Sequence, residues 1–394
     1  MITSLYTPTH VLLGEGAEEK AGEELRKEGA KKVLIHYGSE RVVTTGLMKK
    51  VTDQLDNEGI SYVLLGGVKP NPRVSLVREG IALAEKEGVD FILAVGGGSV
   101  IDSAKAIAYG LYDKTGDVWD FYSGARVPQG SYPIGVILTL AATGSEMSDS
   151  SVITNEEGNL KRGCNTDYCR PRFALLNPEL TYTVLPYQTS CGTADIMMHT
   201  MERYFHAGKT LELSDNLSIA LLKTVAENGV KALSNPKDYE ARKNLMWASS
   251  LSHNGLMQMG NDQRGDWSCH QIEHELSGMY DVAHGAGLTA IWASWARYVY
   301  TKDPERFAKL GAGVFGIKRT ASPERDAEEA IKAFENYFAS IHMPTSLKEL
   351  GINPSDKEID ELAEKATFFG KRTIGAFMTL GKDAIKAIYT AARK

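Results

Sequence analysis

The chain has 394 residues, of which 43% are hydrophobic and 24% charged, values typical of a soluble globular protein with two or three domains. A formal net charge of −6 gives no electrostatic reason to expect binding to nucleic acid or to an anionic membrane. The four cysteines do not form a disulfide framework, so we expect reduced thiols. The sequence has no basic segment before an apolar N-terminal core and no long apolar run, so we expect no signal peptide, no membrane span and a cytoplasmic location.

The first half of the chain repeats strand, turn and helix three times. Short apolar runs at residues 32–37, 61–65 and 90–95 each end at glycine, and segments with helical spacing follow at 47–55, 74–87 and 99–109. This alternation is typical of a parallel sheet covered by helices. Further strands are expected at 134–138, 151–154 and 173–176. We predict an α/β, Rossmann-like nucleotide-binding domain over residues 1–185.

After Pro186 the pattern changes to long amphipathic segments. They cover residues 194–205, 213–233, 242–259, 327–342, 360–368 and 382–393, and turn signals such as Ser234-Asn-Pro236 separate them. We predict an all-α domain over residues 186–394. A ligand site is expected in the cleft between the two domains.

Acidic and imidazole side chains recur at helical spacing between residues 195 and 284. Asp195 and His199 are four residues apart, so on a helix they project from one face and can meet one ion. His270 and His274 have the same spacing, and His284 precedes a glycine-rich segment that we expect to be a flexible turn. One carboxylate with up to three imidazoles suits Zn²⁺ or Fe²⁺ better than Ca²⁺ or Mg²⁺. By spacing alone, a metal site and ordinary structural side chains are equally supported.

Two further segments favour nucleotide binding. Gly96-Gly97-Gly98-Ser99 follows a strand and opens a helix, where backbone N–H groups and the helix N-terminus can approach a phosphate and Ser99 can cap the helix. Small residues and hydroxyls at 139–146 follow the next strand and suit a second lining segment. The alternatives are a tight βα turn and a polar turn, because the first segment is not the G-x-G-x-x-G fingerprint.

The combined motifs resemble those of one known family. Gly96-Gly97-Gly98-Ser99-x2-Asp102-x2-Lys105, Thr143-Gly144-Ser145-Glu146, Asp195-x3-His199 and His270-x3-His274-x9-His284 occur in the order and separation of the iron-containing (group III) alcohol dehydrogenases, butanol-dehydrogenase-like branch. The similarity covers essentially the whole chain. It implies a metal-dependent alcohol dehydrogenase or aldehyde reductase that transfers hydride between NAD(P)(H) and short-chain aliphatic alcohols or aldehydes, such as butanol and butanal.

The resemblance also implies roles for individual residues. The family's metal ligands match Asp195, His199, His270 and His284. His274 matches a histidine near the nicotinamide, a candidate proton relay that is not usually a ligand; a neutral structural role is the alternative. The cofactor positions that match are Gly97, Gly98, Ser99, Asp102, Thr139, Leu140, Thr143, Ser148, Lys161, Tyr182 and Leu185.

The segment after the first predicted strand bears on cofactor preference. An acidic residue at position 39 would repel a 2′-phosphate, and this chain has Ser39 instead. Arg41 can pair with that phosphate, whereas Glu40 opposes it if it points inward. We predict NADP(H) over NAD(H) and include Gly38, Ser39, Arg41 and Asn71 in the cofactor site. The alternative is that both charges simply face solvent. The family is commonly dimeric, so we expect a homodimer.

Several alternatives stay open at this point. The expected ion acts as a Lewis acid toward the substrate oxygen, and iron and zinc cannot be told apart by this ligand set. A glycerol-type polyol dehydrogenase is the nearest enzymatic alternative. A dehydroquinate-synthase-like lyase needs several basic side chains, whereas residues 264–284 contain only Arg264. A nucleotide-binding protein without chemistry is expected to have lost a ligand, and all four are present.

Overall fold

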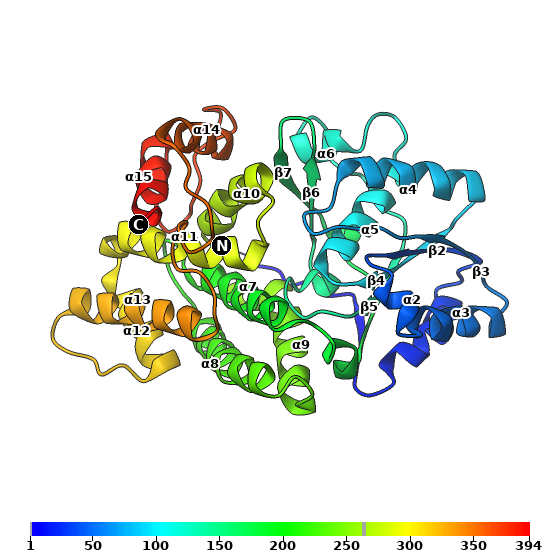
Figure 1. The fold of residues 1–394 in the computed structure, drawn as a ribbon, viewed down its shortest axis with the longest axis horizontal. Helices are drawn as coiled ribbons and strands as arrows, with labels where there is room; N and C mark the ends of the chain where they lie inside the picture. Colours follow the sequence, from blue (N-terminus) through cyan, green and yellow to red (C-terminus); the bar gives the residue numbers. More distant parts are fainter. Residues whose placement is uncertain (1, 262–264) are drawn as a thin grey trace. The chain divides into compact units, whose positions relative to one another are not determined.

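The computed structural model describes residues 2–261 and 265–394, so Arg264 lies outside the described residues. The chain forms two compact units (Figure 1). The sheet unit comprises Tyr6–Val184 and Ser249–Asn254. The helical unit comprises the N-terminal residues up to Leu5, Leu185–Ala248 and Gly255–Lys394.

A six-stranded parallel sheet forms the centre of the sheet unit. Its spatial order is β1 (His10–Leu13), β8 (Phe173–Leu176), β5 (Ile134–Leu138), β4 (Phe91–Gly96), β2 (Lys32–Tyr37) and β3 (Ser61–Leu65). A separate antiparallel hairpin joins β6 (Ser150–Asn155) to β7 (Leu160–Asn165). The strands predicted from apolar runs are confirmed. β1 and β7 were not predicted, because β1 is short and β7 carries Lys, Arg and Gly.

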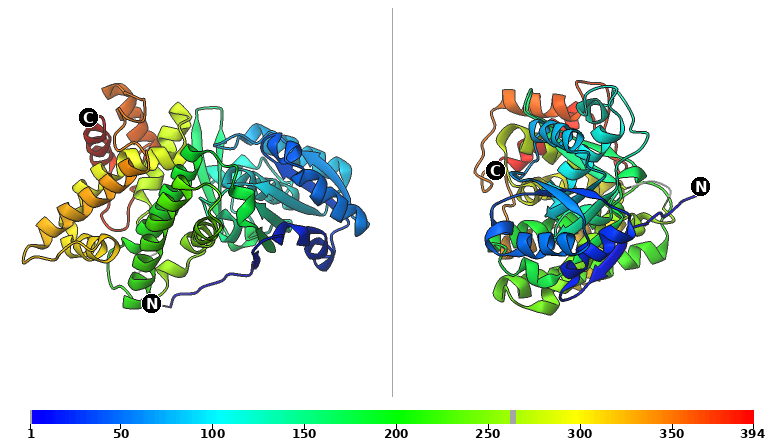
Figure 2. Two further views of the ribbon diagram at one scale, coloured as in Figure 1. Left: turned by 60° about the horizontal axis from the view of Figure 1, so that its bottom comes forward. Right: turned by 90° about the vertical axis from the view of Figure 1, so that its right-hand side faces the viewer.

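Helices cover both faces of this sheet (Figures 1 and 2). They are α1 (Ala21–Lys27), α2 (Arg41–Thr44), α3 (Leu47–Asn57), α4 (Val74–Glu87), α5 (Gly98–Tyr112) and α6 (Trp119–Ser123). Phe91, Leu93 and Val95 of β4 belong to the core that includes α1 and α3, and the alternate residues Ile92 and Ala94 are also fully buried. Because successive strand residues point to opposite faces, both faces of β4 are covered.

The last turn of α9 (Tyr239–His253) belongs with the sheet unit because it bonds to the segment after β5. Ser249 Oγ accepts from the backbone N–H of Gly144 at 3.0 Å. Ser250 Oγ donates to Glu146 Oε1 at 2.6 Å, and burial raises the pKa of that carboxyl. These contacts anchor residues 143–146, one of the two segments predicted to line a nucleotide.

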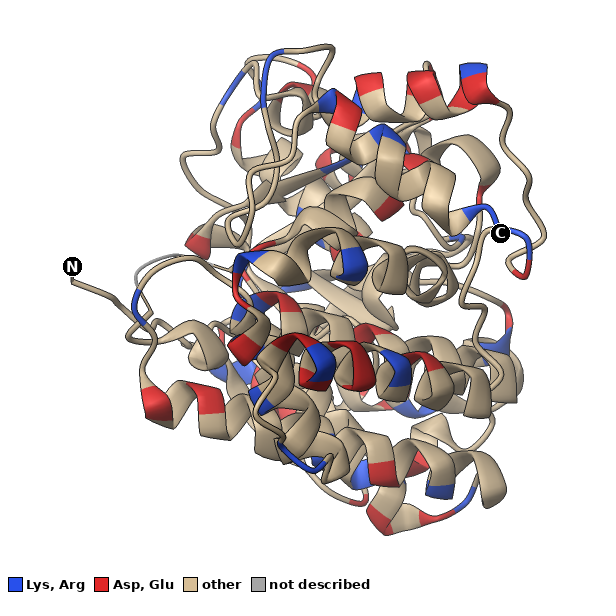
Figure 3. Cartoon of the chain, turned by 90° about the vertical axis from the view of Figure 1, so that its left-hand side faces the viewer, with Lys and Arg blue, Asp and Glu red and all other residues tan. Residues whose placement is uncertain are grey.

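The helical unit contains the remaining long helices. They are α7 (Pro186–Tyr204), α8 (Glu212–Ser234), the first part of α9, α10 (Ser268–Tyr280), α11 (His284–Val299), α12 (Pro304–Phe315), α13 (Pro323–Ser340), α14 (Asp356–Ala366) and α15 (Lys382–Ala392). Both acidic and basic residues lie on the helices of the face seen in Figure 3. Among the described residues no helix combines the length and the apolar run needed to cross a membrane.

Two local predictions were wrong. Ser99 does not cap α5: the helix begins at Gly98, its N-cap is Gly97, and no side chain caps it. The segment after His284 is not a flexible turn, because His284 is the first residue of α11. A Cβ on Gly285 would overlap the backbone of Cys191, so the glycine there permits close packing of α11 on α7 rather than flexibility.

Candidate active site

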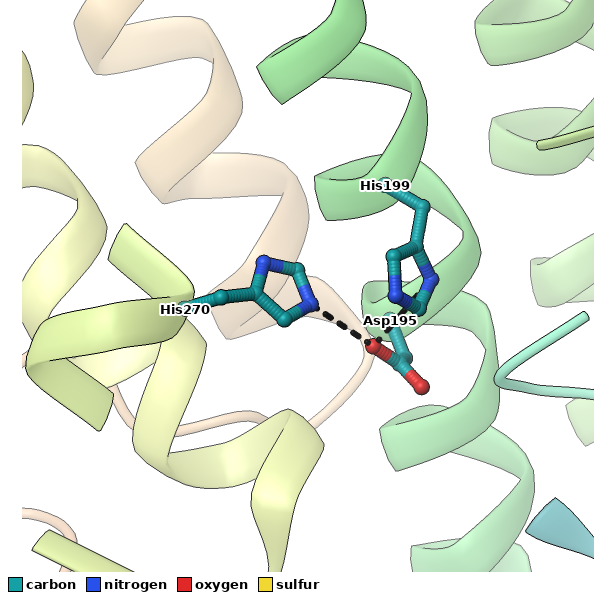
Figure 4. A group of neighbouring side chains, drawn as sticks. All are labelled: Asp195, His199 and His270. Carbon is teal, nitrogen blue, oxygen red and sulfur yellow. Dashed lines mark ion pairs between the residues drawn. The ribbon is translucent and has the colours of Figure 1, made fainter. Parts of the chain in front are cut away.

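Helix α7 places a carboxylate and an imidazole side by side. Asp195 and His199 lie one turn apart and are 2% and 3% exposed. His199 Nδ1 lies 3.5 Å from Asp195 Oδ1 (Figure 4). The four-residue spacing in the sequence therefore produces the predicted contact.

Helices α10 and α11 bring two more imidazoles to the same carboxylate oxygen. His270 Nε2 lies 3.6 Å from Asp195 Oδ1, and His284 Nε2 lies 3.7 Å from it. Figure 4 shows His270 reaching from its own helix toward Asp195. Three ring nitrogens from three helices thus surround one carboxylate oxygen in the helical unit.

The spacing and burial of Asp195, His199 and His270 fit a divalent ion, because one ligand atom from each lies within 4.8 Å of the others. His284 is half-buried and reaches Asp195 Oδ1, but at that distance it groups with Glu273 and His274. Ligand atoms of a tetrahedral ion with bonds of about 2.0–2.2 Å lie about 3.3–3.6 Å apart. Asp195 Oδ1 and His270 Nε2 are buried and have no hydrogen-bond partner, a state that costs about 1–3 kcal/mol per group unless something binds there. Three imidazoles and one carboxylate form a donor set suited to Zn²⁺ or Fe²⁺.

Two buried glutamates hold the far sides of two rings. Glu202, on α7, contacts His270 Nδ1 and accepts from the His270 backbone N–H at 3.1 Å. Glu273, on α10, contacts His284 Nδ1. Burial opposes the charged form of His270, but Glu202 and Asp195 outweigh it and raise its pKa to about 9.

Sequence analysis missed both glutamates. Glu202 lies three residues after His199 and seven after Asp195, so helical spacing places it on the same face of α7. That signal was present in the sequence. Glu273 has no such signal, because its partner His284 lies on the next helix.

His274 lies beside the cluster, with its ring centroid 5.8 Å from that of His284 and 6.4 Å from that of His270. It is half-buried, and its ring atoms group with Glu273 and His284 rather than with Asp195. Trp267 packs its ring 5.4 Å from the ring of His270. The rings of Trp267 and of the half-buried His274 therefore border the cluster.

In the sheet unit the two predicted nucleotide segments touch. A Cβ on Gly97 would lie 3.2 Å from Leu140 Cβ, and a Cβ on Gly98 would overlap the side chain of Thr143. Any other residue at position 98 would push the segments apart. The structure therefore brings together four of the predicted cofactor residues.

Asp102 and Ser148 are joined to this pair of segments through buried contacts. Ser145 Oγ donates to Asp102 Oδ1 at 2.6 Å, and burial raises the pKa of Asp102. Lys105, which is fully buried, donates to the carbonyls of Ser145 at 2.7 Å, Ser148 at 3.0 Å and Ser150 at 2.8 Å. Lys105 thus holds the second segment in place, a role that its position in the motif did not reveal.

The turns after β2, β4 and β5 lie at one edge of the sheet, because paired parallel strands end together. Thr139 donates its backbone N–H to the carbonyl of Gly96 at 3.0 Å. A Cβ on Gly38 would lie 3.5 Å from Val100 Cγ2, in the first turn of α5. Gly38, the exposed Ser39 that follows it, and Thr139 therefore border the glycine turn.

Asn71 and Lys161 are brought near each other by the hairpin. Thr154 of β6 donates its backbone N–H to the carbonyl of Pro72 at 2.7 Å, and Lys161 of β7 is its register partner. Asn71 is buried with a φ of 54°, and Lys161 is 4% exposed. Both predicted residues therefore belong to one packed region of the sheet unit.

Arg41 and Tyr182 are also neighbours. Arg41 begins α2 and donates to the backbone carbonyl of Thr183, the residue after Tyr182. The guanidinium of Arg41 therefore already has one partner within the protein.

Leu185, the last predicted cofactor residue, is 63% exposed and belongs to the helical unit.

Comparison with known proteins gives consistent matches over the whole chain. The family described as iron-containing alcohol dehydrogenase matches residues 8–178, and its C-terminal family matches residues 189–393. The chain is 41% identical over 383 residues to NADH-dependent butanol dehydrogenase A of Clostridium acetobutylicum, with 97% of each chain covered. It is 34% identical over 393 residues to the NADPH-dependent aldehyde reductase YqhD of Escherichia coli, with 99% of each covered. The structure of NADH-dependent butanol dehydrogenase A from Thermotoga maritima superposes with a TM-score of 0.95 at 36% identity, covering 100% of this chain and 99% of that one.

Proposed function

The chain belongs to the iron-containing alcohol dehydrogenase family, and from this premise we propose that it interconverts short-chain aliphatic alcohols and aldehydes, such as butanol and butanal, at an ion held by Asp195, His199, His270 and His284. It is a metal-dependent, NAD(P)-dependent alcohol dehydrogenase or aldehyde reductase. The observation that carries the proposed ligand set is the convergence of three ring nitrogens, at 3.5, 3.6 and 3.7 Å, on Asp195 Oδ1.

Each part of the chain has a distinct task in this proposal. When bound, the ion supplies Lewis-acid chemistry to the substrate oxygen. Gly97 and Gly98 let Leu140 and Thr143 pack against the N-terminus of α5, whose first backbone N–H groups would bind the pyrophosphate. His274 donates the proton that the substrate oxygen needs in the reducing direction, since a half-buried imidazole beside the ligands can exchange protons with solvent. Trp267 helps to exclude water from the ligand rings.

The test is the oxidation of reduced cofactor by butanal, followed at the nicotinamide absorbance. Protein stripped with chelator is expected to be inactive and to recover when reloaded with Fe²⁺ or Zn²⁺. His270→Ala removes one proposed ligand, so it is expected to lose activity by at least about 10²-fold, with recovery on neither ion. Full activity of the stripped enzyme or of His270→Ala would contradict the proposed site. Faster turnover of glycerol than of butanol would favour a polyol substrate over the proposed short-chain aliphatic alcohol.

Cofactor preference is decided in the same assay. We propose NADP(H), on the basis of Ser39 and Arg41. NADH is the second candidate, because Arg41 donates to Thr183 and the relative at 41% identity is NADH-dependent. If NADP(H) is correct, Arg41→Ala is expected to raise the KM for NADPH about 10-fold and leave that for NADH unchanged. A lower wild-type KM for NADH would favour the second candidate.

We propose that the enzyme is a homodimer. Light scattering on the purified protein is expected to give twice the 43.1 kDa mass of one chain. A mass of one chain at micromolar concentration would contradict this proposal.

A further inference from the structure

We propose that Glu202 and Glu273 are positioning residues that fix the tautomers of His270 and His284, so that the Nε2 lone pair of each ring faces the ion. This inference rests on the proposed metal site. Both carboxylates are buried, at 1% and 0% exposed, and each contacts the Nδ1 atom of its histidine. They come from different helices, so two independent contacts serve the same purpose.

The chemistry of imidazole makes the contact decisive. A neutral ring has one N–H and one lone pair, and a carboxylate can only accept. When the ring is neutral, as it must be to bind an ion, the carboxylate of Glu202 keeps the proton of His270 on Nδ1 and leaves the lone pair on Nε2. Nε2 is the atom 3.6 Å from Asp195 Oδ1, and it has no other partner. In the opposite tautomer an N–H would point at Asp195 and exclude the ion.

The contact to Glu202 also fixes how the ring is oriented. One oxygen of Glu202 accepts from the backbone N–H of His270 at 3.1 Å, and the other contacts Nδ1 of the same residue. Two contacts from one carboxylate to one residue restrict rotation of the carboxylate and of the ring together. His199 differs, because it faces Asp195 through Nδ1 rather than Nε2.

Glu273 is held in place by its surroundings. Ser277, one turn later on α10, donates its hydroxyl to Glu273 Oε1. A Cβ on Gly287 would lie 2.8 Å from Glu273 Oε1 and 2.9 Å from its Cγ. Gly287 therefore provides the space that the carboxylate fills between α10 and α11. Replacing Gly287 by Ala would displace Glu273 without changing any charge.

The test measures the affinity for a metal ion and the geometry of its ligands, and it does not depend on enzyme activity. Holoenzyme is stripped, and Zn²⁺ affinity is measured by competition with a chromogenic chelator in wild type, Glu202→Gln and Glu202→Met. Gln keeps an acceptor oxygen without the charge, and Met keeps neither. We expect the Zn²⁺ dissociation constant to rise about 10-fold for Gln and about 100-fold for Met. The same series at Glu273, and Gly287→Ala, are expected to weaken binding in the same direction.

Cobalt substitution supplies the geometric readout. The visible d–d absorption of bound Co²⁺ reports ligand geometry, and we expect it to change in both Met variants. Asp215→Asn is the matched control, because Asp215 is 2% exposed in the same unit and pairs with Arg306 at 2.8 Å and Lys309 at 3.1 Å. We expect it to lower the melting temperature and leave Zn²⁺ affinity and the Co²⁺ spectrum unchanged.

Three outcomes overturn the inference. Met variants that bind Zn²⁺ within about 2-fold of wild type exclude a positioning role, while the proposed function stands. A wild type with two ions per chain that falls to one in Glu273→Met makes Glu273 a ligand of a second ion, with His274 and His284. If the wild type binds neither Zn²⁺ nor Co²⁺, the proposed metal site itself is wrong. Turnover that does not depend on metal would show this independently.

Discussion

Asp195 shows how a single side chain can organise a site contributed by three helices. Its Oδ1 is buried without a hydrogen-bond partner, and three imidazole nitrogens lie within 3.7 Å of it. Buried polar atoms are normally paired, so an unpaired one needs a physical reason. The proposed ion would provide that reason, because it would satisfy the carboxylate and the lone pairs of the rings together.

A different buried histidine, His36 in β2, is held neutral by the fold. Its Nδ1 lies 2.9 Å from the carbonyl of Leu65 and its Nε2 lies 2.8 Å from Ser103 Oγ. Burial lowers its pKa from 6.5 to about 4, and the Leu65 carbonyl offsets only part of this. The unfolded chain therefore binds a proton between pH 6.5 and about 4 that the folded protein rejects.

We predict that His36 contributes to loss of stability in acid. Its contribution is fully present above pH 6.5 and is lost as the pH falls toward 4, so about 2 kcal/mol of stability has been lost at pH 5. Between pH 7.5 and pH 5 the unfolding free energy of His36→Gln, measured with urea, is expected to fall by about 2 kcal/mol less than that of wild type. His342→Gln, at an exposed position, is the control and should keep the wild-type dependence. An unchanged slope in His36→Gln would contradict the prediction.

At the scale of elements, burial explains why one helix of the site was not predicted, whereas α12, which has a solvent-exposed face, was also not predicted. Twelve residues of α11, counted from Gly285 to Val299, are buried, so the helix lacks the polar face that marks an amphipathic segment. It was therefore missed, and His284 was assigned to a turn. Helices with a solvent-exposed face, such as α13 and α15, were predicted close to their observed limits.

Loops between elements depend on residues far away in the sequence. The segment at 143–148 is held by Lys105 from α5 and by Ser249 from α9. No short-range pattern encodes contacts across 40 or 105 residues. The hydroxyl-rich composition of the segment was visible in the sequence, whereas its anchoring required the fold.

At the scale of the whole molecule, the proposed ion joins α7, α10 and α11, which are separated by up to 89 positions between Asp195 and His284. A ligand that binds only the folded state stabilises it by RT ln(1 + [L]/Kd), about 4 kcal/mol at 1,000 times Kd. The metal should therefore be part of what holds the helical unit together.

We predict that chelator treatment lowers the unfolding free energy of wild type by about this amount. Calorimetry with and without added Zn²⁺ measures the difference. His284→Ala is the control, since it lacks one proposed ligand and is expected to show a much smaller dependence on Zn²⁺. Equal transitions for stripped and loaded wild type would show that the ion does not bind the folded state.

The sequence by itself determined the features that depend on neighbours along the chain. It identified six of the eight strands found among the described residues, the helical pairing of Asp195 with His199, and a motif order specific enough to indicate the family. Only the tertiary structure revealed that His284 opens a helix, that Glu202 and Glu273 hold two rings, and that Lys105 anchors a loop. Helical and strand periodicity are local and can be read from spacing, whereas contacts between helices are set by packing of the whole core.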